Sequence, residues 1–371
     1  MRPDRRPRPS GPPAGEDAAP DGVLAHVVLA EDAPGPTLVV RLDRLPPGAL
    51  ALSDELARLR RALARTPYAG LNKIALYGPS AVGAAELDYR FVQALPGGRF
   101  DFRAGCGHSL LACVVADGHA GREVTVRAVT TGDVVRCAPQ KDGAYTLDFL
   151  RPPDAPGTLP TGRPVDVLDG VPVTLVQYGN PYVLVDARHL PADPARLPVD
   201  TGHPPFAGHL PAYTGHPPIA GHLRAHTGHL AADGRHPPVA GTAHVPVDAL
   251  QAWLLELRAQ AARLLGYAPE SPLPKIALFT RTGPGGLAVR ALTVGGWHPR
   301  LALTGAAAFA AAGAIGGTVV GGPVSRLRTP GAGTATVSTA PDRVRVHHKR
   351  ARLLQRLDLP WPAPWRIHAT A

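Results

Sequence analysis

The chain has 371 residues, 44% of them hydrophobic and 18% charged, a composition that suits one large or two ordinary globular domains. Its 39 lysines and arginines outnumber 29 acidic residues, which gives a net charge of +10. Arginine is scattered along the chain and no aromatic-interleaved basic motif accompanies it. The positive charge alone would suggest a nucleic-acid-binding protein, but the scattered arginines and the missing motif argue against one. The positive field would still favour an anionic small molecule as the partner.

Three features set the expected environment. Residues 1–22 are rich in proline, glycine and arginine and hold no apolar stretch, which predicts a disordered tail and no secretory signal. No apolar run is long enough for a membrane span, so we expect no membrane partner. Three cysteines without a Cys-x-x-Cys pair predict a reducing, cytoplasmic setting.

The first half of the chain shows a regular order of segments. Residues 73–77 (KIALY) and 87–95 (LDYRFVQAL) are strand-like runs separated by a turn that contains glycine and proline. A Gly-Cys-Gly turn then leads into the apolar residues 108–116, and residues 122–135 form a further strand-like run. We expect strand, turn, strand, turn, apolar helix and strand.

The second half repeats this order. Strand-like runs at 275–279 (KIALF) and 286–294 precede an apolar helix over 301–315 and a strand-like run over 317–327. Residues 246–266 precede them and predict an amphipathic helix. Its apolar face comprises Leu250, Trp253, Leu254, Leu257, Ala261 and Leu264.

The repeated order favours an internal duplication over a chance recurrence of KIAL. The expected fold is α+β, with two pseudo-symmetric domains over residues 23–165 and 166–345 and a C-terminal segment over 346–371. Each domain would be a curved, mainly antiparallel sheet or barrel around a central apolar helix, because a helix that is hydrophobic all round must be enclosed. We expect both helix N-termini to face an interdomain cleft, where free N–H groups suit a carboxylate.

A histidine-rich insert at about 200–244 contains a tandem repeat, TGHPPFAGHLPAY followed by TGHPPIAGHLRAH. Metal binding is one interpretation, but Pro-Pro blocks helix formation, and neither cysteine nor a recognised ligand spacing accompanies the histidines. We expect an expanded surface loop and no metal site.

Several motifs resemble the PrpF family of methylaconitate and methylitaconate isomerases and oxalomesaconate tautomerases, which has a diaminopimelate-epimerase-like fold. The similar stretches include LNKIALYG, GCGHSLLACV and GVPVTLVQYGNPYVLVDARHL, and together they cover most of residues 70–190 and 250–325. The most specific is the family's HPA-x-x-x-TGA run, matched by His298-Pro299 and residues 304–306. The chain departs from the family at AEDAPGPTLVV, which replaces RGGTSKG, and at His108, which replaces an asparagine.

The resemblance implies that Lys73 is the proton-transfer base and that Cys106 faces it across the substrate. Lysine acts as a base only where burial or a nearby cation lowers its pKa, and arginine cannot replace it. The chain has only four lysines among its 39 basic residues, so a retained lysine indicates a need for an amine. The alternative for Lys73 is a surface lysine at a strand end. We interpret Lys275 as its structural counterpart.

Cys106 has two interpretations. It is either a small buried hydrophobe or a thiol whose pKa is lowered at a helix N-terminus. The flanking glycines, which allow close approach of a ligand, favour the second. Cys113 and Cys137 we assign to the core.

Further residues of these motifs are candidates for substrate binding. They are Asn72, Gly107, His108, Ser109, Asn180, His298, Thr304 and Gly305. Ser109 or His108 would otherwise cap the first apolar helix, and Pro299 would mark the entry of the second. The backbone amides of residues 107–109 and 304–306 would stabilise a dienolate.

These residues predict an isomerase, independent of cofactor and metal, that shifts or isomerises a C=C bond next to a carboxylate or carbonyl. Its substrate would be a small unsaturated carboxylate or carbonyl compound, such as an intermediate of specialised metabolism. An epimerase or racemase on the same fold and a non-catalytic binding protein are the alternatives. The sequence leaves the formation of a homodimer open.

Overall fold

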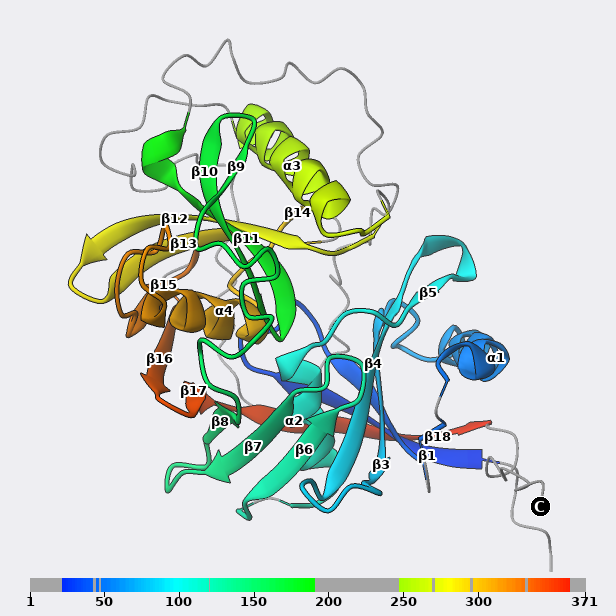
Figure 1. Cartoon of the computed structure of the whole chain (residues 1–371). Helices are drawn as coiled ribbons and strands as arrows, with labels where there is room; N and C mark the ends of the chain where they lie inside the picture. The colour runs from blue at the N-terminus through cyan, green and yellow to red at the C-terminus, as the bar shows by residue number, and fades with distance from the viewer. Residues whose placement is uncertain are drawn as a thin grey trace, which may run out of the picture.

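The computed structural model describes residues 22–42, 45–46, 48–119, 121–190, 247–268, 271–293, 296–330 and 333–360. The expected tail before residue 22 and the histidine-rich insert lie outside these residues. Within them, the chain is a mixed α/β protein with one large, mostly antiparallel sheet and four α-helices (Figure 1). No helix in these ranges is long and apolar enough to cross a membrane.

The elements of the first half run from residue 22 to residue 149. They are β1 (Gly22–Ala30), β2 (Thr37–Arg41), α1 (Ser53–Leu63), β3 (Lys73–Pro79), β4 (Leu87–Ala94), β5 (Phe100–Asp101), α2 (Gly107–Ala116), β6 (Val124–Ala128), β7 (Val134–Pro139) and β8 (Tyr145–Phe149). Two short 3-10 helices, at Leu50–Leu52 and Pro96–Gly98, complete this half.

The second half extends from residue 166 to residue 360. Its elements are β9 (Asp166–Leu168), β10 (Val171–Tyr178), β11 (Asn180–Asp186), a 3-10 helix (Ala187–His189), α3 (Val247–Leu264), β12 (Lys275–Gly283), β13 (Gly286–Thr293), β14 (Gly296–Trp297), α4 (Leu303–Ala314), β15 (Arg326–Arg328), β16 (Thr334–Ala340), β17 (Arg343–Lys349) and β18 (Ala351–Pro360).

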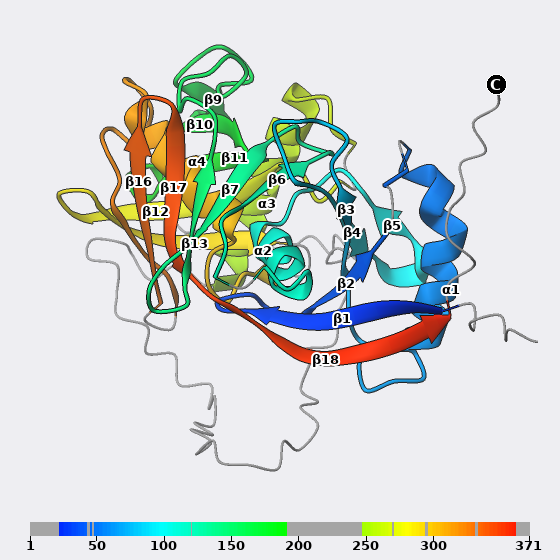
Figure 2. The ribbon, with the colours of Figure 1, turned by 90° about the horizontal axis from the view of Figure 1, so that it is seen from below.

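The strand pairing occurs twice in the same pattern. In the first half, β2 runs parallel to β3, β3 pairs antiparallel with β4, and β4 runs parallel to β6. In the second half, β11 and β12, β12 and β13, and β13 and β15 pair in the same three ways. β18 returns to pair along β1 (Figure 2). β17 pairs with β8. The expected division into two domains stays a prediction.

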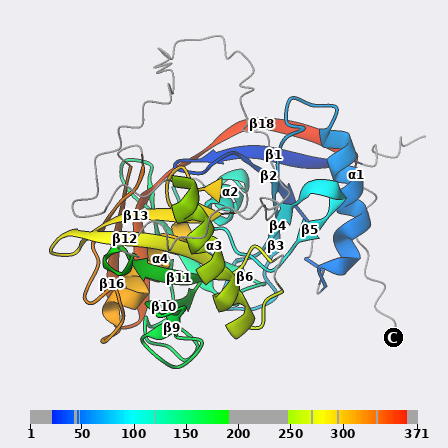
Figure 3. The ribbon, with the colours of Figure 1, turned by 90° about the horizontal axis from the view of Figure 1, so that it is seen from above.

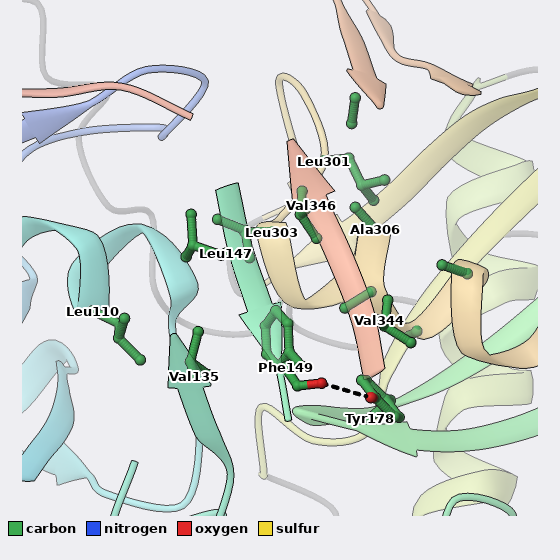
Figure 4. Close-up of a cluster of buried hydrophobic side chains, with 14 of the residues drawn as sticks. Leu110, Val135, Leu147, Phe149, Tyr178, Leu301, Leu303, Ala306, Val344 and Val346 are labelled. Atoms are coloured by element: carbon green, nitrogen blue, oxygen red, sulfur yellow. Dashed lines mark hydrogen bonds between the residues drawn. The ribbon is translucent and has the colours of Figure 1, made fainter. Parts of the chain in front are cut away.

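The two apolar helices are enclosed, as their sequence predicts. Residues 107–114 of α2 and 303–313 of α4 are all buried. One hydrophobic cluster includes both helices and strand residues from both halves, such as Val135, Phe149 and Val344 (Figure 4). The Tyr178 hydroxyl donates to the Phe149 carbonyl oxygen at 3.3 Å within it. This shared core fixes the N-termini of α2 and α4 relative to one another.

The amphipathic helices α1 and α3 cover two separate outer faces of the sheet (Figure 3). Leucines of α1 pack on β2 and β3, and the apolar face of α3 packs on β10, β11 and β12. Leu264 is 49% exposed, so its expected place on the apolar face of α3 is wrong. It is the last residue of the helix, where the chain leaves the sheet.

One predicted strand is largely a turn. The expected run at 317–327 contributes only its end to β15, which begins at Arg326. Gly317, Gly321 and Gly322 adopt positive φ angles, which interrupt an extended strand. The Thr318 hydroxyl donates to the Ala312 carbonyl oxygen at 2.8 Å and folds this segment back onto α4.

Candidate active site

The N-termini of α2 and α4 meet at the centre of the molecule. A Cβ atom on Gly107, the first residue of α2, would lie 2.6 Å from Cδ2 of Leu303, the first residue of α4. Only glycine at position 107 permits this approach. Because the first N–H groups of a helix lack intrahelical partners, the two helices bring unpaired donors and positive dipole ends to one place.

Cys106 is the N-cap residue of α2, with extended backbone angles and no side-chain cap. Its carbonyl oxygen accepts the Leu110 amide at 2.9 Å and the Tyr89 hydroxyl at 3.0 Å. The expected capping role of Ser109 is wrong, because Ser109 is the third residue inside the helix. Its hydroxyl instead lies 2.9 Å from the Thr37 hydroxyl of β2.

Asn180, at the start of β11, holds the turn that carries Cys106. Its Oδ1 accepts the Gly105 amide at 2.6 Å and its Nδ2 donates to the Gly105 carbonyl oxygen at 2.8 Å. The same Nδ2 donates to the Thr304 hydroxyl of α4 at 3.3 Å. Asn180 therefore connects the thiol turn to the second helix, and its amide is fully buried.

Lys73 begins β3, and only 8% of its surface is exposed. Its Nζ donates to the carbonyl oxygen of Gly35, in the loop between β1 and β2, at 3.2 Å. Burial lowers the pKa of the Lys73 ammonium, and the nearby Cys106 opposes this effect. The preceding Asn72 is half-buried, and its carbonyl oxygen accepts the Gln93 amide group at 2.9 Å.

Lys275 joins the same cluster, which our interpretation of it as a structural counterpart did not anticipate. It begins β12 beside Tyr182 of the parallel strand β11, with its ammonium 6.0 Å from the Tyr182 ring centroid. Burial lowers the pKa of the Lys275 ammonium, Cys106 raises it, and the charge of Lys73 lowers it further. Lys275 therefore lies within electrostatic range of both predicted catalytic residues.

Two neutral histidines complete the cluster. Burial holds the pKa of His108 well below its ordinary value, and the charges of Lys73 and Lys349 lower this pKa further. Burial, together with Lys275 and Lys73, lowers the pKa of His298 from 6.5 to about 3. His298 Nδ1 accepts the Arg300 amide at 3.1 Å, which leaves Nε2 to carry the ring proton.

The N-terminus of α4 differs from the sequence expectation in two ways. The helix begins at Leu303, so Pro299 lies before its first turn instead of inside it. The amides of Gly305 and Ala306 donate to the Ala302 carbonyl oxygen at 2.8 Å and 3.1 Å, so their expected role in dienolate binding is wrong. Among the amides expected to bind the dienolate, those of Thr304 and of residues 107–109 lie in the first turn of a helix, where amides have no intrahelical partner.

Tyr182 contributes a buried hydroxyl that the sequence motifs did not single out. Tyr182 is 1% exposed, and a Cβ atom on Gly305 would lie 2.8 Å from its Oη. The hydroxyl lies near Thr304 and Cys106 but meets hydrogen-bond geometry with none of the described residues. Gly305 therefore serves to admit this hydroxyl to the N-terminus of α4.

A cleft of about 260 Å³ adjoins the cluster. It is lined by Glu31, Asp32, Arg300, Gly333, Thr334, Thr336, His347, His348 and Lys349. Asp32 pairs with Lys349 at 3.3 Å and with Arg300 at 3.7 Å. Lys349 also acts electrostatically on His108, and the Arg300 backbone amide donates to His298, so two of the lining residues connect the cleft to the site.

The electrostatics of the site favour an anionic ligand. Three of the four lysines act on His108, and in the described ranges no carboxylate forms an ion pair with Lys73 or Lys275. Nor do those ranges contain a group of three or more His, Cys, Asp or Glu residues that could hold a metal ion. The groups present can transfer protons and bind a carboxylate or an enolate.

No family model and no curated protein matches the chain. Among solved structures, a methylitaconate-delta-isomerase aligns with a TM-score of 0.56 and 20% identity, over 91% of this chain and 96% of its own. A hydroxyproline epimerase from Agrobacterium vitis aligns with a TM-score of 0.49 and 14% identity, over 91% and 92%. A PhzF-family protein from Bacillus anthracis aligns with a TM-score of 0.45 and 12% identity, over 91% and 99%. The alignment with the methylitaconate-delta-isomerase shows that the chain shares the fold of that structure, as its PrpF-like motifs predict.

Proposed function

We propose that the chain is a cytoplasmic, cofactor-independent isomerase that moves a C=C bond by proton transfer next to a carboxylate or carbonyl. The observation that carries the proposal is a buried primary amine, Lys73, beside a thiol at a helix N-terminus. Burial favours the neutral amine, which is the form that accepts a proton. The N-terminal amides of α2 favour the negative oxygen that develops when a conjugated acid loses a proton.

In this reaction, the neutral amine of Lys73 removes a proton from the carbon next to the double bond. The electron pair of that C–H bond moves into a dienolate, whose oxygen accepts hydrogen bonds from the amides of residues 107–109 and Thr304. A proton then reaches the other end of the allylic system, and the double bond settles in its new position. Cys106 delivers or relays this second proton, or orients the substrate.

The substrate would be a small unsaturated carboxylate or carbonyl compound. Neutral His108 stands where the family has an asparagine, so it offers an imidazole to a substrate group in place of an amide. This difference supports a substrate distinct from those of the family. We propose Asn180 as a positioning residue, because its amide bonds go to Gly105 and Thr304.

The test is proton NMR in D2O with a probe panel of methylitaconate, cis-aconitate, but-3-enoate and an unsaturated ketone. We expect solvent deuterium to enter at least one probe as its double bond moves. Lys73→Gln and Cys106→Ala should each slow the conversion by about 100-fold or more, a typical contribution of one acid–base group. Lys141→Gln, which changes an exposed lysine outside the site, is the matched control. Unchanged turnover in both site variants would refute the proposal.

A two-thiol epimerase is the less favoured activity. It needs a second thiol opposite Cys106, and the matching segment before α4 carries Trp297 and His298 instead. The remaining cysteines, Cys113 and Cys137, are fully buried in the core. Burial raises the pKa of both thiols, which suits core packing and not proton transfer at the site.

A further inference from the structure

Lys73 and Lys275 occupy equivalent positions in the two halves of the chain. Each is the first residue of a strand that runs parallel to one neighbour and antiparallel to the next. Ile74, which follows Lys73, pairs with Leu38 of β2, and Ile276, which follows Lys275, pairs with Val183 of β11. One amine comes from each half of the chain, and both lie within electrostatic range of Cys106 at the N-terminus of α2.

The same groups surround both amines. Cys106 acts on Lys73 and on Lys275, and both lysines act on His108 and His298. Neither lysine has an ion-pair partner among the described carboxylates. In contrast, Lys349 at the edge of the site is neutralised by Asp32 at 3.3 Å. In the proposed function, Lys73 is the only one of these two amines that transfers a proton.

The charge of Lys73 adds to burial in lowering the pKa of Lys275, because a cation in a low-dielectric site disfavours a second cation near it. Two amines that are coupled strongly in this way hold a single proton between them, in the way that two adjacent carboxyl groups share one. One amine is then a base while the other is an acid. An allylic isomerisation needs these two functions at once, on two different carbon atoms.

We propose that Lys275 is the second proton-transfer residue of the site, acting as the acid when Lys73 acts as the base. This step rests on the proposed function. A substrate C–H bond breaks as an N–H bond forms on Lys73, the double bond shifts, and an N–H bond of Lys275 breaks as a new C–H bond forms. Water then carries a proton from the Lys73 ammonium to the Lys275 amine, and the roles reverse in the opposite direction. Cys106 orients the substrate between them.

The first test needs no substrate. Labelling with lysine that carries ¹³C at the ε position gives four signals, because the chain has four lysines, and Lys→Arg variants assign them. We expect Lys73 and Lys275 to titrate below the ordinary pKa of lysine, and Lys73→Gln to raise the pKa of Lys275. A Lys275 signal that titrates at the ordinary lysine pKa and does not respond to Lys73→Gln would overturn the shared-proton pair.

The second test separates proton transfer from charge. With a probe that the wild type converts in D2O, Lys275→Gln and Lys275→Arg should both lose conversion by about 100-fold or more. Both should keep deuterium entry at the carbon that Lys73 deprotonates. Ethylamine should restore part of the activity of Lys275→Ala, and Lys141→Gln should match the wild type.

Conversion by Lys275→Arg within about tenfold of the wild type would show that only a cation is needed, and would overturn the acid role. Failure of the wild type to exchange any probe would refute the proposed function instead, and the titration would still decide whether the amines share a proton. Circular dichroism and thermal denaturation of each variant establish that a loss of conversion does not come from unfolding.

Discussion

Replacement of Asn180 by alanine should both destabilise the protein and disturb the thiol turn. The wild-type amide pairs with both backbone groups of Gly105, at 2.6 Å and 2.8 Å, in a fully buried position. Alanine leaves that N–H and that carbonyl oxygen without partners. Each of these two buried unsatisfied groups costs about 1–3 kcal/mol, so the free energy of unfolding should fall by about 2–6 kcal/mol.

Urea denaturation followed by circular dichroism measures this loss. Asn72→Ala is the matched control, because Asn72 is the only other asparagine and is half-buried without a described side-chain hydrogen bond. We expect the control to lose less than about 1 kcal/mol. Asn180→Asp should be intermediate, because it keeps the acceptor for the Gly105 amide but turns an oxygen toward the Gly105 carbonyl. If Asn180→Ala unfolded within about 0.5 kcal/mol of the wild type, the turn would not depend on this amide.

Two further predictions concern packing and protonation at the site. Gly107→Ala puts a Cβ atom 2.6 Å from Leu303 Cδ2, so thermal denaturation should show a loss of about 1–3 kcal/mol that Leu303→Ala partly offsets in the double variant. No offset would mean that the two helix N-termini do not press on each other. The pKa of His298 is lowered from 6.5 to about 3, so the unfolded chain binds the extra proton between these values and stability falls as pH falls through this window. The full effect is on the order of 4–5 kcal/mol, and denaturation of His298→Gln from pH 7 to pH 3 should give a flatter pH profile. An unchanged profile would contradict a buried neutral imidazole.

Patterns that depend on local periodicity were predicted well from the sequence. Helices α2 and α4 are apolar on all sides, and such helices must be enclosed whatever the details of the sheet. The repeated order of segments also predicted β3, β4, β12 and β13. The motifs also singled out Cys106 and Lys73, and Cys106 acts electrostatically on the Lys73 ammonium. The catalytic roles of the two residues stay predictions.

Features that depend on contacts between distant segments were not predicted. The Gly305 amide bonds to the Ala302 carbonyl oxygen, and Ser109 lies inside α2. Both facts depend on the residue at which each helix begins, and the periodicity of the sequence does not determine that residue. The place of Lys275 in the site follows from the pairing of β11 with β12 and from the meeting of the two helices. The rarity of lysine was the one sequence signal that pointed to a role for Lys275. The internal repeat led us instead to interpret Lys275 as a structural counterpart of Lys73.

The turn after α4 shows a similar limit. Its apolar residues suggested a strand, but three glycines with positive φ angles direct the chain back toward the helix. Glycine in sequence indicates that such angles are permitted, whereas the tertiary contacts decide that they are used.

The most direct test of the account is deuterium exchange into the probe panel in D2O, with the wild type, Lys73→Gln and Lys141→Gln compared side by side. We expect the wild type and Lys141→Gln to incorporate deuterium while moving the double bond of at least one probe, and Lys73→Gln to do both about 100-fold or more slowly. Equal exchange by Lys73→Gln and the wild type would contradict the assignment of Lys73 as the base. Absence of exchange from every probe by the wild type would contradict the proposed isomerase.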